Sequence, residues 1–345
     1  MNADPNASAG ASQRLVAVLE NVAIARDTYR LRLDDPILAR AILPGPFPMI
    51  RPAAEGADDP LLGRPFALYD VTTDAAGAPT AVDVVYLVVG RGTAALAQRR
   101  PGEQLSVWGP LGNGFGPPPA GPVIFVAGGI GQTPFLALGR WWLGKMSYGL
   151  QSKGIDPHCP GPAAGVPKSP SATLLYGVRT AALLAGVNDF RQVGIDVEIA
   201  TDDGSAGYRG FVTEILARRL KQGERRARIV GCGPSPMLAA LASLVEPFDI
   251  PCEVSLENHM ACGFGACFSA SPRYANPMVR STSAASALNA EIRGQKVDDN
   301  LTFVRGIKDT QTQRAILPAM GSAGSPDPAR LRGESGCARV WQTEP

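Results

Sequence analysis

Two cysteines separated by four residues are the most specific chemical feature of the sequence. Cys262 and Cys267 enclose the glycine-rich turn Gly-Phe-Gly-Ala, and Cys252 stands ten residues before the first of them. Thiolates ligate metals and take part in redox reactions, and glycines let backbone N–H groups turn toward sulfur atoms. Six unevenly spaced cysteines do not indicate a secreted disulfide framework. We therefore expect this pair to bind metal or to take part in redox chemistry.

Two further glycine turns each follow an apolar run and precede a helical pattern. The apolar runs are residues 122–127 and 227–230. Glycines permit a tight turn and the close approach of a pyrophosphate, which then lies at a helix N-terminus. For Cys232 the alternative interpretation is a small buried residue. The turn residues that we expect at a dinucleotide are Gly128, Gly129, Gly131, Thr133, Cys232, Gly233 and Pro234.

An acidic pair, Asp202 and Asp203, follows another short apolar run at residues 196–200. Carboxylates beside the adenosine ribose would repel the 2′-phosphate of NADP, so the pair favours NAD. A solvated acidic turn is the alternative interpretation.

An arginine and a second kind of glycine turn lie earlier in the chain. Arg64 precedes Pro65 at the start of an apolar segment, and its guanidinium group has the geometry to bind a pyrophosphate. Gly92 and Thr93 follow an apolar run at residues 82–89 and begin a helical pattern. Taken alone, each feature is also compatible with an ordinary strand start or a capped turn.

The sequence pattern, and with it the expected secondary structure around these residues, changes along the chain. Residues 14–118 contain short β-branched and apolar runs at 15–22, 28–33, 82–89 and 104–108, which indicate a small antiparallel β-barrel. Residues 119–248 alternate apolar runs with helical patterns at 134–143, 212–220 and 236–244, which indicate a parallel α/β sheet. The remaining segments are a disordered N-terminus at 1–13, an inserted surface loop at 147–171, a cysteine-rich stretch at 249–269 and a poorly ordered tail at 270–345, with a short strand possible at 301–304.

The order of these motifs resembles that of ferredoxin-reductase-like flavoproteins. The resemblance covers residues 14–268 and implies an FAD-binding β-barrel followed by an NAD-binding α/β domain. Relatives often have serine where Ala67 stands and arginine where Leu87 stands. The positions that the resemblance assigns to FAD are Arg64, Pro65, Phe66, Ala67, Val85, Tyr86, Leu87, Gly92 and Thr93.

The cysteine stretch narrows the resemblance to the electron-transfer subunits of NAD-linked dihydroorotate dehydrogenase. In that family the motif Glu-x-x-Met-Ala-Cys-Gly-x-Gly-Ala-Cys carries a [2Fe–2S] cluster, which implies Cys262 and Cys267 as ligands. The family's third cysteine is replaced by Ala270, and a fourth is absent from its usual place. The cluster therefore lacks a full set of family ligands, and Cys252 does not occupy a ligand position. We hypothesise a reading-frame shift or a natural loss of the C-terminal cluster lobe after about residue 269.

By this resemblance the protein passes electrons from an FMN-containing dihydroorotate dehydrogenase catalytic subunit, through a cluster and FAD, to NAD⁺ in pyrimidine biosynthesis. No side chain stands out as a general acid or base, which fits hydride transfer between bound rings. One alternative is a cluster-free flavin reductase with another acceptor. The other is a non-catalytic binding subunit.

Composition excludes several classes of protein. The net charge of +2 gives no electrostatic footprint for nucleic acid. The richest apolar stretch, residues 122–144, is interrupted by glycines, Gln132 and Arg140, so we expect no membrane span. Residues 1–13 lack the apolar core of a secretory signal, and a cytoplasmic protein is the expectation.

Overall fold

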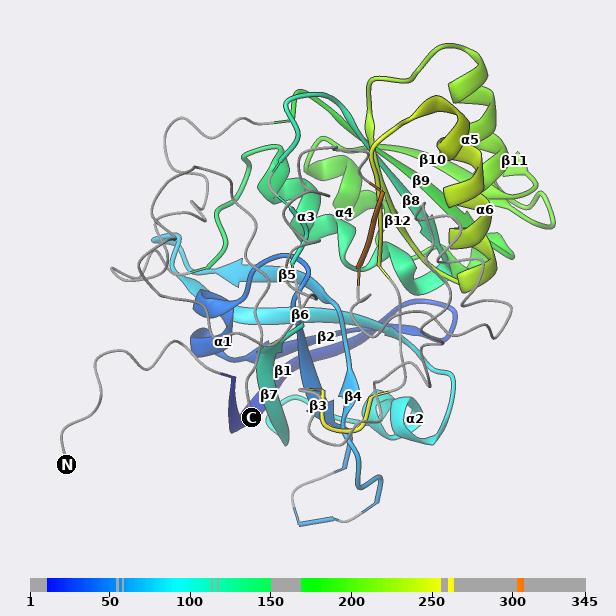
Figure 1. Cartoon of the computed structure of the whole chain (residues 1–345). Helices are drawn as coiled ribbons and strands as arrows, with labels where there is room; N and C mark the ends of the chain where they lie inside the picture. Colours follow the sequence, from blue (N-terminus) through cyan, green and yellow to red (C-terminus); the bar gives the residue numbers. More distant parts are fainter. Residues whose placement is uncertain are drawn as a thin grey trace, which may run out of the picture.

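The computed structural model describes residues 11–53, 56–57, 59–112, 114–116, 118–149, 169–255 and 260–263, together with the backbone of residues 303–306. In this part of the chain two β-sheets form, one antiparallel and one largely parallel, and Figure 1 shows the antiparallel sheet below the parallel one. The predicted combination of a β-barrel-like half and an α/β half is thereby confirmed.

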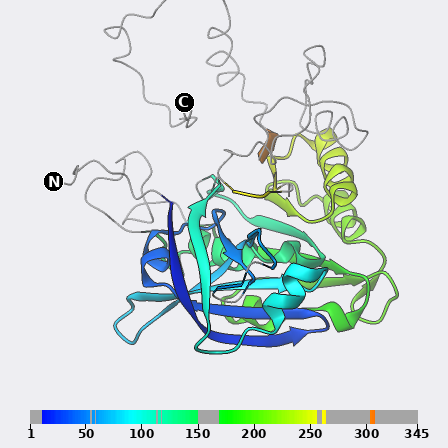
Figure 2. The same ribbon diagram turned by 90° about the horizontal axis from the view of Figure 1, so that it is seen from below.

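The antiparallel sheet has seven strands in the order β4-β3-β7-β1-β2-β6-β5. Figure 2 shows its two long strands β1 and β7 side by side. No pairing among the described residues joins the edge strands β4 and β5, so the predicted antiparallel barrel takes the form of a curled half-barrel. Its strands are β1 Ser12–Ala25, β2 Thr28–Asp34, β3 Phe47–Arg51, β4 Arg64–Pro65, β5 Leu68–Thr73, β6 Pro79–Leu87 and β7 Gln104–Leu111.

Two short helices connect strands of this sheet. Helix α1, Pro36–Ala41, begins where the Asp35 carboxylate accepts a hydrogen bond of 2.9 Å from the Leu38 backbone N–H. This side chain satisfies one of the donors that every helix start leaves unpaired, and proline suits the next position. Helix α2, Arg91–Ala97, follows the Gly90 turn.

The second sheet has the order β11-β10-β9-β8-β12-β13-β14. Every pair in it is parallel except β13 with β14. Its strands are β8 Val123–Gly128, β9 Ala172–Val178, β10 Asp196–Thr201, β11 Tyr208–Arg209, β12 Arg228–Cys232, β13 Cys252–Ser255 and β14 Phe303–Gly306. Its helices are α3 Phe135–Trp142, α4 Val187–Gln192, α5 Val212–Lys221 and α6 Ser235–Val245, with 3₁₀ turns η1 Gly129–Gln132, η2 Ala181–Leu183 and η3 Glu246–Phe248.

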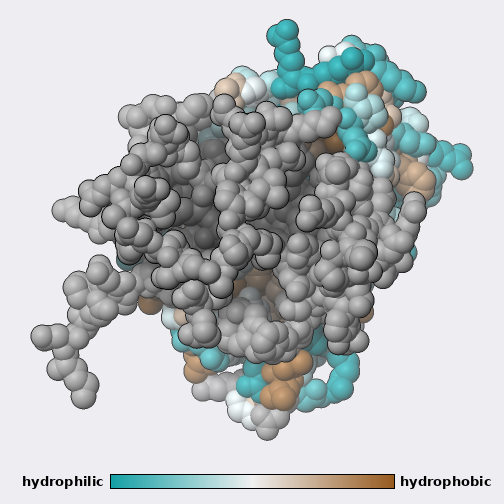
Figure 3. All heavy atoms as spheres, in the orientation of Figure 1, coloured by the Kyte–Doolittle hydropathy of each residue, from teal (hydrophilic) through white to brown (hydrophobic). Residues whose placement is uncertain are grey.

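Two clusters of buried side chains hold these layers together. One lies between the parallel sheet and helices α5 and α6. The other runs without interruption from the interior of the antiparallel sheet to α3 and the α3 side of the parallel sheet. The halves of the molecule therefore share a core, and α3 and α4 lie between the two sheets in Figure 1. The outer surface near α5 and β11 is mainly hydrophilic (Figure 3).

Several boundaries differ from the sequence-based prediction. Strand β1 starts at Ser12, inside the predicted disordered N-terminus, because Ser12 and Gln13 pair with Gly109 and Trp108 of β7. Tyr148, at the start of the predicted surface loop, is only 4% exposed and belongs to the core. The predicted strand at 301–304 overlaps β14, which pairs with β13.

Other predicted segments lie outside the described residues. These are residues 1–10 of the N-terminus, residues 150–168 of the inserted loop, residues 256–259 and 264–269 of the cysteine-rich stretch, and the tail apart from β14. Cys267 and Ala270 lie outside the described residues, and of the predicted cluster-loop remnant the structure describes residues 249–255 and 260–263. No helix of the described chain is long and apolar enough to cross a membrane.

Candidate functional site

The two predicted dinucleotide turns meet where the parallel sheet reverses its strand order. After β8 the chain adds β9 and β10 on one side and then β12 on the other, so the reversal lies between β8 and β12. In open α/β sheets ligands bind at such a point, outside the carboxyl ends of the strands. The first turn follows β8 there, and the second follows β12.

Glycine is required where these turns touch. A Cβ atom on Gly131 would lie 2.3 Å from the Cys232 carbonyl oxygen, and one on Gly128 would lie 2.7 Å from Cδ of Pro234. Both distances are too short for any side chain. The close packing explains why both turns are glycine-rich, and it brings the backbone of both to one edge of the sheet.

A cleft of about 640 Å³ opens along this edge. Of the predicted nucleotide residues, Gly128, Gly129, Asp202 and Pro234 line it. Gly131, Thr133, Asp203, Cys232 and Gly233 are not among the lining residues. Thr133 and Cys232 are buried, at 5% and 3% exposed. The cleft also takes in Thr28 and Leu87 of the antiparallel sheet, so it extends from one half of the molecule to the other.

The two residues of the acidic pair, Asp202 and Asp203, have different surroundings. Asp202 lines the cleft. The Asp203 carboxylate instead accepts hydrogen bonds from the Ser205 hydroxyl at 2.6 Å and the Ser205 backbone N–H at 2.9 Å. The Ser205 hydroxyl group is the main cause that lowers the pKa of Asp203. Asp203 thus belongs to a surface turn, which is the alternative that the sequence left open.

Several lining residues were missed by sequence reasoning. Arg179 lies at the cleft directly after β9, with Thr213 and Phe211 across from it at the start of α5. Strand β9 ends at Val178, so Arg179 is the first residue after it. The signal that could have identified Arg179 is the Gly-Val-Arg-Thr sequence, which places an arginine at the carboxyl end of the strand. Tyr176 also lines the cleft, and burial raises the pKa of its hydroxyl group to about 12.

The predicted FAD motifs lie together on the antiparallel sheet. Nε of Arg64 is 3.4 Å from the position of a Cβ on Gly92, so the arginine and the glycine turn are in contact distance. The N-cap residue of α2 is Gly90 and not Thr93. Its hydroxyl oxygen accepts from the backbone N–H groups of Val89 and Gly90 at 2.9 and 3.2 Å, which holds the turn before α2. The Arg64 guanidinium group also donates to the Gly63 carbonyl at 3.0 Å.

The other predicted flavin residues differ in their exposure. Phe66 and Tyr86 are 7% and 2% exposed, and their rings pack edge to face with centroids 5.7 Å apart. The Tyr86 hydroxyl donates to the Asn21 amide oxygen at 3.0 Å. Val85 is buried as well. Pro65, Ala67 and Leu87 are half-buried, and of these Leu87 lines the cleft.

The first cysteine of the close pair lies against the antiparallel sheet. The indole N–H of Trp108 donates to the Cys262 carbonyl at 2.9 Å. The next residue, Gly263, has a φ of +84°, and a Cβ there would lie 2.7 Å from Cγ of Met49. In Figure 1 residues 260–263, in yellow, lie beside β3 and β4.

These residues do not complete the ligand set of an iron–sulfur centre. Among the described residues no three histidine, cysteine, aspartate or glutamate side chains are grouped to hold a metal ion. Cys252 is 8% exposed within β13, and burial raises the pKa of its thiol to about 12. Cys252 belongs to the cluster of buried side chains between the parallel sheet and helices α5 and α6.

No protein-family model matches the chain. It is 34% identical over 254 residues to the electron transfer subunit of dihydroorotate dehydrogenase B (NAD(+)) from Desulforamulus reducens, covering 73% of this chain and 85% of that protein. The subunit of the same name from Geobacillus kaustophilus is 35% identical over 262 residues, with coverage of 75% and 85%.

Solved structures show the same architecture. The NADH-dependent reduced ferredoxin-NADP oxidoreductase superposes with a TM-score of 0.59 at 24% identity, covering 74% of this chain and 81% of that one. The ferredoxin reductase of carbazole 1,9a-dioxygenase gives 0.54 at 21% identity, with coverage of 70% and 67%. At these identities the likeness establishes the ferredoxin-reductase-like fold.

Proposed function

The chain belongs to the family of electron-transfer subunits of NAD-linked dihydroorotate dehydrogenase B, and we propose that it carries electrons between a catalytic partner subunit and NAD⁺. As a member of this family it is an oxidoreductase subunit of the flavoprotein class. The observation that carries the proposal is the cleft at the strand-order reversal, whose wall combines Gly128 and Pro234 of the nucleotide turns with Leu87 of the antiparallel sheet. A single cleft of this kind can hold a nicotinamide ring against a flavin.

The described residues suit an FAD site on the antiparallel sheet. Residues 14–118 would form the FAD-binding half, with Arg64 binding the pyrophosphate through its guanidinium group. Gly92 leaves room for that group, and the Thr93 hydroxyl holds the adjacent turn. The flavin ring system would be supported by Phe66, Ala67, Val85, Tyr86 and Leu87. Leu87 lines the cleft and would touch the rings directly. Phe66 and Tyr86 would support them through their buried edge-to-face packing. When bound, FAD supplies reversible hydride exchange with nicotinamide.

Residues 119–248 would form the NAD-binding half. The backbone of Gly128 and Gly129 faces the cleft and would bind the pyrophosphate, with Gly131 and Gly233 keeping the turns close together. We assign Asp202 the selection of NAD over NADP, because this residue lines the cleft and its negative charge would repel a 2′-phosphate. Arg179, whose charge lies at the same edge, would neutralise part of the pyrophosphate. None of these residues has to exchange a proton.

The family membership implies a catalytic partner subunit, and we propose that this partner contains FMN, oxidises dihydroorotate and works with the chain in the cytoplasm. The [2Fe–2S] cluster implied by the family motif is not part of this proposal. The described residues do not fit it, so we derive no electron path through it. This observation favours a second candidate, a cluster-free flavin reductase.

An absorption spectrum of the purified full-length protein, with iron and acid-labile sulfide measured on the same sample, tests the proposal. Flavin bands that bleach on addition of NADH are expected. Iron and sulfide together would identify the complete electron-transfer subunit, and flavin without iron would identify the cluster-free reductase. A colourless protein that neither binds FAD nor oxidises NADH would overturn both and leave a non-catalytic binding subunit.

The Arg64→Ala variant tests the flavin site itself. Loss of a charged hydrogen-bond donor to the pyrophosphate should weaken FAD binding by about 10–100-fold, corresponding to about 1.5–3 kcal/mol. Arg100→Ala is the matched control, because it removes the same charge from an exposed position after α2. Fluorescence titration with FAD measures both, and equal affinities in the two variants would contradict the assignment of Arg64.

A further inference from the structure

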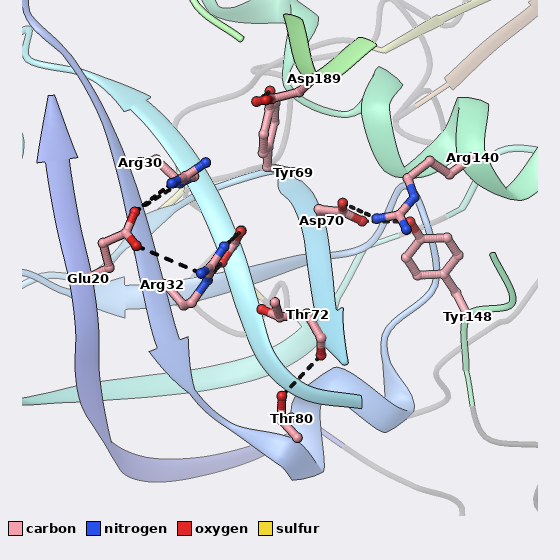
Figure 4. Close-up of polar contacts among 11 residues, drawn as sticks. Glu20, Arg30, Arg32, Tyr69, Asp70, Thr72, Thr80, Arg140, Tyr148 and Asp189 are labelled. Carbon is pink, nitrogen blue, oxygen red and sulfur yellow. Dashed lines mark hydrogen bonds and ion pairs between the residues drawn. The ribbon is translucent and has the colours of Figure 1, made fainter. Parts of the chain in front are cut away.

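Strand β5 makes polar contacts to the α/β half through two consecutive residues. Tyr69 and Asp70 follow the Arg64–Ala67 segment after a single residue. Consecutive side chains of a regular strand point to opposite faces, but the pairing of β5 with β6 shifts between Leu68 and Asp70. Such a bulge redirects side chains. It allows both residues to reach the helices of the other sheet, as Figure 4 shows.

The first contact joins Tyr69 to α4. The tyrosine hydroxyl donates to the Asp189 carboxylate at 2.6 Å, and its ring packs edge to face on Phe190 at 6.4 Å. Tyr69 is 2% exposed. Its hydroxyl also lies 2.2 Å from where a Cβ on Gly186 would be, and Gly186 has a φ of +68°. The start of α4 is therefore shaped to receive this hydroxyl group.

The second contact joins Asp70 to α3 and to the segment that follows it. The Asp70 carboxylate forms an ion pair with Arg140. Its other oxygen accepts a hydrogen bond of 2.7 Å from the Tyr148 hydroxyl. Asp70 and Arg140 have side-chain exposures of 16% and 26%, so the pair is largely withdrawn from water. We call the two contacts together the β5 clamp: Tyr69–Asp189 and Asp70–Arg140–Tyr148.

The clamp lies between the two predicted cofactor sites. On one side the chain runs back within a few residues to Arg64 and Ala67, the predicted FAD segment. On the other, Leu183 and Ala185 line the nucleotide cleft just before Gly186 and α4. The distance between the two sites is therefore set across a short, buried connection rather than through a flexible linker.

We propose that the β5 clamp positions the nicotinamide site relative to the flavin site, with Tyr69 and Asp189 as positioning residues for hydride transfer. The inference rests on the proposed function. Hydride transfer needs the two rings near van der Waals contact, and a misplacement of about 1 Å can cost about 100-fold in rate. Two polar contacts that share no atoms restrain the rotation of one half on the other better than one contact does.

The test is a double-mutant cycle on the full-length protein with FAD bound. Tyr69→Phe, Asp189→Ala and the double variant each lack the same hydrogen bond. In each variant, NADH should reduce the bound flavin about 10–100-fold more slowly, as measured by stopped flow. The double variant should be no slower than the slower single variant, because both changes remove one interaction. Asp189→Asn, which keeps an acceptor for the tyrosine hydroxyl, should recover most of the rate.

Two further readouts separate positioning from a purely structural role. The long-wavelength charge-transfer band of stacked flavin and nicotinamide should weaken in the single variants, while kcat falls more than KM rises. Glu20→Gln and Glu198→Gln are the controls, since each removes an ion pair within one half of the molecule. They should leave the band and the reduction rate unchanged even where they lower the melting temperature.

The contrary result is a normal band and a reduction rate within twofold of the unsubstituted protein in every Tyr69 and Asp189 variant that retains FAD. That would overturn the clamp while leaving the proposed function intact. If Tyr69→Phe does not fold, the Asp189 variants decide the question from the other partner. An unsubstituted protein that binds FAD but is not reduced by NADH would instead count against the proposed function, and the clamp would fall with it.

Discussion

The indole N–H of Trp108 donates a hydrogen bond to the carbonyl oxygen of Cys262, which lies 154 residues further along the chain. The same indole also approaches the FAD segment: a Cβ on Gly63, next to Arg64, would lie 2.2 Å from its Cη2 atom. Trp108 thus connects the cysteine loop to the segment that carries the predicted flavin arginine. Cys262 and Gly263 are thus packed against the antiparallel half.

Replacing Trp108 with phenylalanine should loosen the cysteine loop. A neutral hydrogen bond contributes about 1 kcal/mol, so the loop should open about fivefold more often. Cys262 should then react about fivefold faster with a thiol reagent, as followed by peptide mass spectrometry. Trp141→Phe is a matched control, because the buried Trp141 indole nitrogen has no hydrogen-bond partner in the described structure. Equal Cys262 reactivity in both variants would mean that the indole bond does not hold the loop.

Cys252 and Cys262 should behave as different kinds of cysteine. With its pKa raised to about 12 by burial, the Cys252 thiol should not react with iodoacetamide at pH 8 in the folded protein. Cys252→Ala should lower stability by about 1–2 kcal/mol through lost packing and leave the iron content of reconstituted protein unchanged. Cys262→Ser should lower any iron content without a comparable loss of stability. A Cys252 that is alkylated as fast as Cys262 would contradict its place in the sheet core.

Asp202 and Asp203 are expected to differ in nucleotide selection. Asp202→Ala removes a carboxylate from the cleft wall, so kcat/KM for NADPH relative to NADH should rise about tenfold, equivalent to about 1.4 kcal/mol. Asp203→Ala is the control, because that carboxylate is bound to Ser205 in a surface turn. The ratio should change less than twofold there. A similar rise in both variants would indicate a general effect of charge rather than a contact with the ribose.

The nucleotide half was predictable because its signals are local. An apolar run followed at once by glycines and a helical pattern identifies a strand, a turn and a helix, and the turns at Gly128 and Cys232 are of this kind. The order of strands then places both turns at one edge without any knowledge of side-chain contacts. For Arg64 and Gly92 the order of the motifs, through the family resemblance, predicted one shared FAD site, and the structure places the two residues within contact distance.

Contacts between distant segments were not predictable in this way. Tyr69 and Asp189 are 120 residues apart, and the bulge that directs Tyr69 toward Asp189 leaves no mark in the alternation of β5. Strand β13 is four residues long, too short for a pattern, so the burial of Cys252 within it could not be read from the sequence. The bond between Asp203 and Ser205 was likewise not predictable, because it depends on the backbone of the turn.

The ion pairs on β1, β2 and β6 predict a pH dependence of stability. Glu20 accepts hydrogen bonds from Arg30 at 2.6 and 3.2 Å, and this contact is the largest cause that lowers the pKa of Glu20 from its usual 4.5 (Figure 4). A carboxylate with a lowered pKa stabilises the fold above its unfolded value, and this contribution is lost as pH falls through the folded value. The pH range in which this stabilising contribution is lost therefore lies below about pH 4.5.

Glu20→Gln should accordingly lower the free energy of unfolding by about 0.5–1 kcal/mol at pH 7, because the pair is partly exposed. The difference between the variant and the unsubstituted protein should be smaller at pH 3 than at pH 7, because the contribution of the Glu20 charge is lost as pH falls below its unfolded pKa toward its lowered folded pKa. Urea unfolding followed by circular dichroism at the two pH values measures it. Glu246→Gln is the control, since the exposed Glu246 makes no ion pair within the described structure. A Glu20 effect of equal size at both pH values would show that packing of the side chain, and not its charge, supports the strand pair.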